Sequence, residues 1–73
     1  MKFALYSCVA LAVDVPAEGI RRGAVATILE HHASPAPGVE PGYSVEVFNA
    51  AGETLAVLTL PESSFEALRP MKC

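Results

Sequence analysis

A basic turn between two glycines leads directly into a segment of strand-forming residues, and this junction constrains the fold more than any other part of the chain. Gly19 and Gly23 flank Arg21-Arg22, and residues 24–31 then read AVATILEH. Glycine adopts the positive φ values that tight turns need, whereas valine, isoleucine and threonine favour strands. The junction therefore predicts a loop that enters a long strand of a small all-β domain.

Turn-forming residues divide the rest of the chain into further strands. A short valine-rich run ends at Pro16, which lacks the amide donor of a sheet ladder. Residues 43–48 alternate between apolar and polar side chains, and residues 54–60 form an apolar run that Pro61 stops. A turn that contains Gly52 separates the two segments. We expect strands over residues 9–15, 24–31, 43–48 and 54–60.

Two segments are expected to lie outside the strands. Residues 33–42 hold three of the six prolines and two glycines, a density that excludes regular structure and predicts an exposed loop. Ser63 and Glu66 have the spacing of a helix capping box, which predicts a short helical turn near the C-terminus. Phe65 and Leu68 beside it would plug the open end of the sheet.

Together these elements predict an all-β fold, a small SH3-like and partly open barrel of four to five strands with a short C-terminal helical turn. The 73 residues make one domain over residues 1–73, because a chain of this length is too small for two cores. The expected core consists of Val9, Leu11, Val13, Ile20, Val25, Ile28, Val45, Val47, Leu55, Val57 and Leu60.

The charge balance disfavours nucleic acids as partners, and the distribution of apolar residues disfavours membranes. Eight acidic residues against five basic ones give a net charge of −3, and the basic residues are scattered along the chain. Such a chain repels phosphate backbones. No apolar run approaches the roughly 18 residues of a membrane-spanning helix. The partners that composition favours are therefore another protein or a second copy of the chain.

No catalytic, cofactor-binding or metal-binding residues are expected. His31 and His32 are adjacent, and neighbouring residues on a strand point to opposite faces, so the pair cannot easily share a metal. His32 with Glu30 is the better same-face pair, yet no spacing matches a zinc site. Cys8 is an available nucleophile with no base placed beside it. We therefore expect that the protein is not an enzyme.

The two cysteines, Cys8 and Cys73, are too few for the disulfide framework of a small secreted domain. Cys8 lies among apolar residues, where a reduced cysteine behaves as a small hydrophobic side chain. This pattern favours reduced thiols and a cytoplasmic location.

Several segments together resemble a bacterial family, the domain of unknown function 4926. The opening is carried by LYSCVAL at residues 5–11, DVP at 14–16 and GIRRG at 19–23. YSVEVF at 43–48, GET at 52–54 and LTLP at 58–61 are similar to the rest of the pattern. The resemblance reaches from residue 5 to about residue 69. It implies the fold and a bacterial source, but no activity.

Members of this family are implied to be small, acidic proteins, some of them encoded beside toxin-like proteins, so an antitoxin or immunity role is one implication. Two features depart from the pattern. Ala24 and Ala26 replace an aspartate and a glycine that usually follow the basic turn, and the 33–42 loop is longer than is typical.

Three functions stay open at this point. The favoured one is a non-enzymatic protein–protein interaction module that uses exposed sheet edges, through backbone hydrogen bonds, and the Arg21-Arg22 turn. The second is a nucleic-acid-binding small barrel, with Tyr43 and Phe48 as stacking platforms. The third is a homo-oligomeric structural protein. The candidate partner-binding residues are accordingly Arg21, Arg22, Tyr43 and Phe48.

Overall fold

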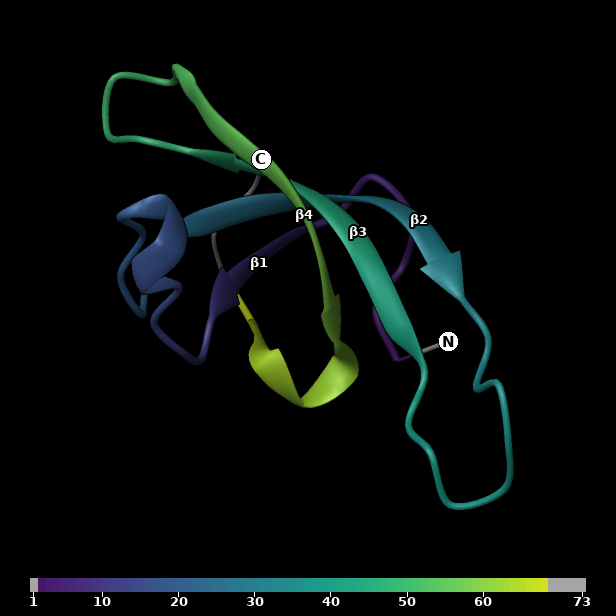
Figure 1. Ribbon diagram of the computed structural model, residues 1–73. Coiled ribbons are helices and arrows are strands. Elements are labelled where there is room, and N and C mark those ends of the chain that lie inside the picture. Colours follow the sequence, from purple (N-terminus) through teal and green to yellow (C-terminus); the bar gives the residue numbers. More distant parts are fainter. Residues whose placement is uncertain (1, 69–73) are drawn as a thin grey trace.

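The computed structural model describes residues 2–68, which form one five-stranded antiparallel sheet with the order β4-β3-β2-β1-β5 (Figure 1). Two 3₁₀ turns are the helical elements of this part, and none of its helices has the length and hydrophobicity that a membrane crossing requires. The predicted all-β class is confirmed. The elements are β1 (Cys8–Leu11), η1 (Pro16–Glu18), β2 (Val25–His32), β3 (Gly42–Phe48), β4 (Thr54–Pro61), η2 (Glu62–Ser64) and β5 (Phe65–Ala67).

The sheet curls into a small, partly open barrel. β4 and β5 lie at opposite ends of the strand order, yet only the three-residue turn η2 separates them in the chain. A flat sheet could not bring its two edges so close together. In Figure 1, the chain turns back at the lower end of β4 through η2 and returns toward β1, with which β5 pairs.

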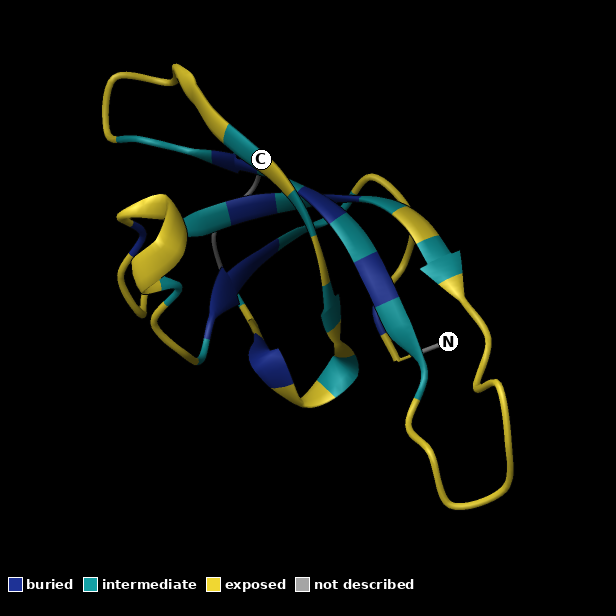
Figure 2. Ribbon diagram, viewed as in Figure 1, coloured by how far each residue is buried: buried dark blue, intermediate teal, exposed yellow. Residues whose placement is uncertain are grey.

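The core lies inside this curl, and β3 shows most clearly how the sequence builds it. Its residues alternate between half-buried and buried positions, with Tyr43, Val45 and Val47 fully buried (Figure 2). Burial of one such side chain contributes about 1.5–3 kcal/mol to folding. The buried apolar cluster consists of Phe3, Val9, Leu11, Ile20, Ala26, Ile28, Tyr43, Val45, Val47 and Phe65.

The expected core was wrong at three positions, because Val13, Leu55 and Val57 are exposed. On β4 the reason is the register: Val45 of β3 pairs with Leu58. Since side chains alternate between the faces of a strand, Leu58 shares the inner face with Val45, and Val57 must point outward. The inward residues of β4 are therefore Ala56, Leu58 and Leu60, which pack against the core while remaining half-exposed. Val25 is also half-buried rather than buried.

The ends of the sheet also differ from expectation. β1 stops at Leu11, four residues early, because the next residue donates its backbone N–H to Ser64 O at 2.7 Å. The C-terminal helical turn exists as η2, but no side chain caps it. Ser63 instead donates from its backbone N–H and its hydroxyl to the Glu40 carboxylate, at 2.6 and 3.0 Å. Glu66 lies in a fifth strand, opposite Ala10.

The proline-rich segment is an exposed loop, as predicted. Residues 32–40 are all exposed and connect β2 with β3. Gly38 adopts a φ of +81° within this loop. β3 begins at Gly42, one residue before the strand that the sequence predicts.

Candidate functional site

The loop between β1 and β2 holds the basic pair in a fixed position. Val15 and Ile20 form an isolated antiparallel bridge with two backbone hydrogen bonds of 2.8 and 3.1 Å. The chain reverses between them through η1 and Gly19, whose φ is +66°. The Ile20 side chain is buried in the core and anchors the loop. Arg21 and Arg22 therefore leave the sheet from a braced turn.

A carboxylate completes this turn. Asp14 Oδ1 accepts a hydrogen bond from the Arg22 backbone N–H at 2.8 Å, and Gly23 N donates to Leu11 O at 2.7 Å. Gly23 has a φ of +93°, a conformation that side chains rarely adopt. Asp14 thus supplies a carboxylate to this turn from the other side of the loop.

Replacing Asp14 with alanine is expected to lower the free energy of unfolding by about 0.5–1.5 kcal/mol, because the Arg22 amide loses its acceptor. Urea denaturation followed by circular dichroism measures the loss. Glu18→Ala, which removes an exposed carboxylate from the same loop, serves as the matched control. Equal stability of the two variants would contradict a bracing role for Asp14.

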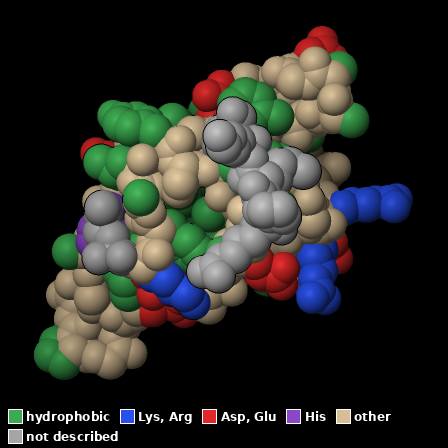
Figure 3. Space-filling model, turned by 180° about the vertical axis from the view of Figure 1, so that it is seen from behind, with side chains coloured by type: hydrophobic (Ala, Val, Ile, Leu, Met, Phe, Trp, Pro, Cys, Tyr) green, Lys and Arg blue, Asp and Glu red, His purple; other side chains and the backbone are tan. Residues whose placement is uncertain are grey.

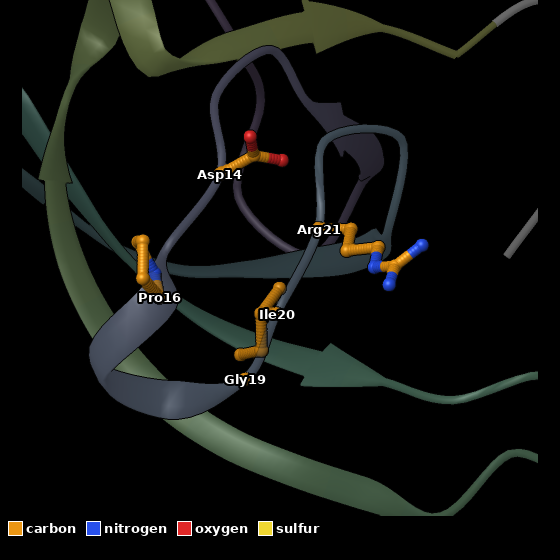
Figure 4. A pocket seen from close by; sticks show the side chains of 5 residues that line it. All are labelled: Asp14, Pro16, Gly19, Ile20 and Arg21. Carbon is orange, nitrogen blue, oxygen red and sulfur yellow. The ribbon is translucent and has the colours of Figure 1, made fainter.

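The two arginine side chains differ in their surroundings. Arg22 Nη2 lies 3.7 Å from Glu66 Oε1, and both side chains are more than half exposed, so this ion pair contributes little. Arg21 forms no ion pair with any residue in the part of the chain from 2 to 68. Arg21 is one of the residues that line an open hollow of about 600 Å³. Figure 4 shows its side chain extending away from Pro16. Basic side chains stand out from this end of the molecule in Figure 3.

A second hollow, of about 360 Å³, joins this loop to the outer face of the sheet. Its apolar part is formed by Val25 and Phe48, which are cross-strand partners on β2 and β3, and by Leu55 of β4, which is 51% exposed. We call it the arginine groove. Its lining residues are Gly19, Ile20, Arg21, Arg22, Gly23, Ala24, Val25, Phe48, Asn49, Ala50 and Leu55.

The composition of the arginine groove fits an apolar and acidic ligand. Two arginines belong to its lining and no acidic residue does. Arginine holds carboxylates through paired hydrogen bonds, and the aromatic and aliphatic side chains beside it offer apolar contact area. The groove can therefore bind an apolar side chain that has a carboxylate next to it.

Three of the four predicted partner-binding residues come together here. Arg21, Arg22 and Phe48 all line the arginine groove, although more than 25 positions separate the arginines from the phenylalanine. Leu55 was missed as a groove residue, because the apolar pattern of residues 54–60 assigned it to the core. Its outward position follows from the register between β4 and β3, and the apolar pattern of β4 alone does not reveal this register.

Tyr43, the fourth predicted residue, is no surface platform, because its side chain is fully buried. Its hydroxyl accepts hydrogen bonds from the backbone N–H groups of Lys2 and Phe3, at 3.1 and 3.2 Å. The same hydroxyl donates to Glu62 Oε2 at 2.8 Å. Burial, together with the Glu62 carboxylate, raises the pKa of Tyr43 above its ordinary value. Tyr43 therefore joins the N-terminal segment, β3 and η2.

Residues 5–67 match the family described as a domain of unknown function, DUF4926. The chain belongs to this family. The match spans β1 to β5 and includes all the residues of the arginine groove. No curated protein and no solved structure matches the chain. The description of this family names no activity.

The two histidines of this DUF4926 member point to opposite faces of β2, as expected. The ring of His31 lies 5.2 Å from the ring of Tyr43 on the inner side. His32 Nε2 faces outward, 2.7 Å from Ser44 Oγ and 3.5 Å from Glu30 Oε1. A catalytic relay uses both ring nitrogens, one for the serine and one for the carboxylate. Here both groups meet the same nitrogen, so the arrangement is a polar row on the surface.

Metal-binding and thiol chemistry add no second site. Within residues 2–68, no three histidine, cysteine, aspartate or glutamate side chains are grouped so that they could hold a metal ion. Cys8 Sγ lies 3.9 Å from Thr27 Oγ1. Cys8 takes part in a disulfide, which corrects the expectation of a reduced thiol. Cys73 lies outside the described residues.

Proposed function

We propose that this domain is a non-enzymatic protein–protein interaction module that binds its partner through the arginine groove. The observation that supports this proposal is the convergence of Arg21, Arg22 and three outward apolar side chains in a hollow without an acidic residue. Arginine and aromatic side chains are enriched at protein interfaces and supply much of their binding energy.

The partner segment that fits is acidic and apolar. Arg21 has no carboxylate partner among residues 2–68, so its guanidinium is available to an acidic group of another protein. Arg22 keeps only an exposed contact of 3.7 Å with Glu66, which a stronger carboxylate contact can replace. An apolar residue beside that group would then pack against Phe48 and Leu55.

The partner is proposed to be encoded beside this protein, with an antitoxin- or immunity-like neutralisation as the consequence of binding. This step rests on what the family resemblance implies, namely that some members are encoded beside toxin-like proteins. A nucleic-acid partner is less well supported. The chain has a net charge of −3, and the buried Tyr43 offers no stacking surface, which leaves Phe48 alone of the two expected platforms.

The test is co-purification with the products of adjacent genes, followed by titration of the captured protein. The variant that combines Arg21→Ala and Arg22→Ala is expected to weaken binding at least about tenfold, because truncation of interface arginines removes one or more kcal/mol. Raised salt should weaken the wild-type complex as well.

Lys2→Ala is the matched control, since it removes a positive charge from an exposed residue that does not line the arginine groove. It should leave the affinity unchanged. Circular dichroism verifies that each variant is folded. Undiminished binding by the double variant would refute the groove as the binding surface, and the absence of any captured neighbour under native expression would count against the adjacent-gene partner.

A further inference from the structure

β4 is an edge strand with an apolar sequence in exposed surroundings. It pairs with β3 on one side and with no other strand of residues 2–68 on the other. Its eight residues, TLAVLTLP, carry no charge, and not one of them is buried. β3 beside it buries every second residue. β4 is thus an apolar strand without the burial that such a sequence normally obtains.

The usual protections of an edge strand are absent from the middle of β4. Monomeric proteins place charged side chains, prolines or bulges on their edges to prevent pairing with another chain. Here Pro61 and the register irregularity at Val47/Phe48 lie at the two ends of the β3–β4 pair. Between them, Leu55 and Val57 point outward and are 51% and 63% exposed. Among residues 2–68, no strand pairs with the backbone groups along this edge.

The inner face of β4 shows the same incompleteness. Ala56, Leu58 and Leu60 pack against the core, yet each stays half-exposed. Their partners Val47, Val45 and Tyr43 on β3 are fully buried. The core of residues 2–68 therefore thins toward β4, and a further strand with inward apolar residues would cover it.

A second copy of β4 meets these requirements in an antiparallel pairing about a two-fold axis at Val57. Val57 would then face its own counterpart, Ala56 would face Leu58 of the second copy, and Leu55 would face Thr59 of the second copy. Inward residues meet inward residues, as strand alternation demands. In this register Glu53 does not lie opposite Glu62 of the second copy. β4 itself holds no charged residue that would repel its counterpart.

We propose that two copies of the chain associate through β4 and join their sheets edge to edge around Val57. The interface is isologous, as in most homodimers, and it binds through backbone hydrogen bonds together with the apolar residues on both faces. The proposal does not depend on the proposed function: Leu55 belongs to both surfaces, but Arg21 and Arg22 take no part in the β4 interface, and Val57 does not line the arginine groove. Binding of another protein at the arginine groove and self-association through β4 can fail separately.

Light scattering coupled to size-exclusion chromatography tests the proposal on the full chain. The wild type is expected to shift, as its concentration rises, from 7.7 kDa to twice that mass. Val57→Lys should raise the dimer dissociation constant at least about tenfold, because it sets two like charges opposite each other at the axis. The fold should tolerate this lysine, since Val57 pairs with Glu46 on β3.

Val39→Lys is the matched control, because Val39 is 49% exposed in the loop between β2 and β3 and is not part of β4. It should dimerise like the wild type. A second measurement needs no variant: hydrogen exchange of alternate β4 amides should slow as the wild-type concentration rises. A wild type that stays monomeric up to about 1 mM, or a folded Val57→Lys that dimerises like the control, would overturn the proposal.

Discussion

Replacing Ile28 with alanine is expected to lower the free energy of unfolding by about 2–5 kcal/mol, the largest loss predicted for this chain. Ile28 is fully buried on β2, where it pairs with Val45. β2 has a strand on either side, so the surrounding side chains cannot collapse easily into the space left behind. Urea denaturation followed by circular dichroism gives the change.

Leu55→Ala provides the comparison, because it removes the same number of carbon atoms from a side chain that is 51% exposed. Its cost is expected to stay within about 0.5 kcal/mol. Both variants should be measured at low protein concentration, so that self-association through β4 makes no contribution. Comparable losses at the two positions would mean that Leu55 belongs to the core after all.

Replacing Tyr43 with phenylalanine is expected to cost about 1–3 kcal/mol, although the ring keeps its place in the core. The change leaves the backbone N–H groups of Lys2 and Phe3 without their acceptor, and the Glu62 carboxylate without its donor. The Phe3 contact is buried, where an unpaired polar group is expensive. Tyr6→Phe is the control, because that hydroxyl belongs to a residue that is 71% exposed.

The same hydroxyl should make stability depend on pH in the alkaline range. The pKa of Tyr43 is raised in the folded protein, so the folded state holds this proton more tightly than the unfolded state does. The resulting stabilisation is complete below the ordinary pKa of about 10 and disappears as the pH rises through the higher pKa of the folded state. Unfolding midpoints measured across this range should fall more steeply for the wild type than for Tyr43→Phe. Parallel profiles would contradict the assignment.

The central strands and their turns could be predicted because each carries its own local signal. Alternation defined β3, and Gly23 marked the entry to β2. The hairpin after β3 likewise follows from Asn49, whose Oδ1 accepts hydrogen bonds from the backbone N–H groups of Ala51 and Glu53 at 2.9 Å. Such interactions lie within a few residues of each other and are therefore visible in the sequence.

The faces of β4 and the strand β5 could not be predicted in the same way. Both faces of β4 are apolar, so its composition does not say which residues point inward, and only the pairing of Val45 with Leu58 decides it. β5 has three residues, too few for an alternation to be recognised, and the spacing of Ser63 and Glu66 pointed to a helix cap instead.

Residue types in the sequence indicate which side chains can contact a partner, but separations along the chain do not indicate which of them lie together in the structure. Arg21, Arg22 and Phe48 were identified as candidates for contact with a partner, but their convergence with Leu55 depends on the curl of the sheet. Tyr43 was misjudged because its hydroxyl finds partners about 40 residues away in the N-terminal segment. An amphipathic side chain alone does not distinguish such a buried hydrogen-bonding role from an exposed one.

The pairing of β5 with β1 sets the order in which this protein can be made. Leu11 lies opposite Phe65, and Val9 lies opposite Ala67. β1, the first strand to be synthesised, must therefore wait for β5, the last one, before its second edge is paired. The pairs β1–β2, β2–β3 and β3–β4 join consecutive strands and can form as the chain emerges from the ribosome, but the barrel cannot close before β5 has emerged. Closure of the barrel is expected only when residues up to about 67 are free, and the folding rate should lie in the slow, millisecond-to-second range of domains dominated by long-range β pairing.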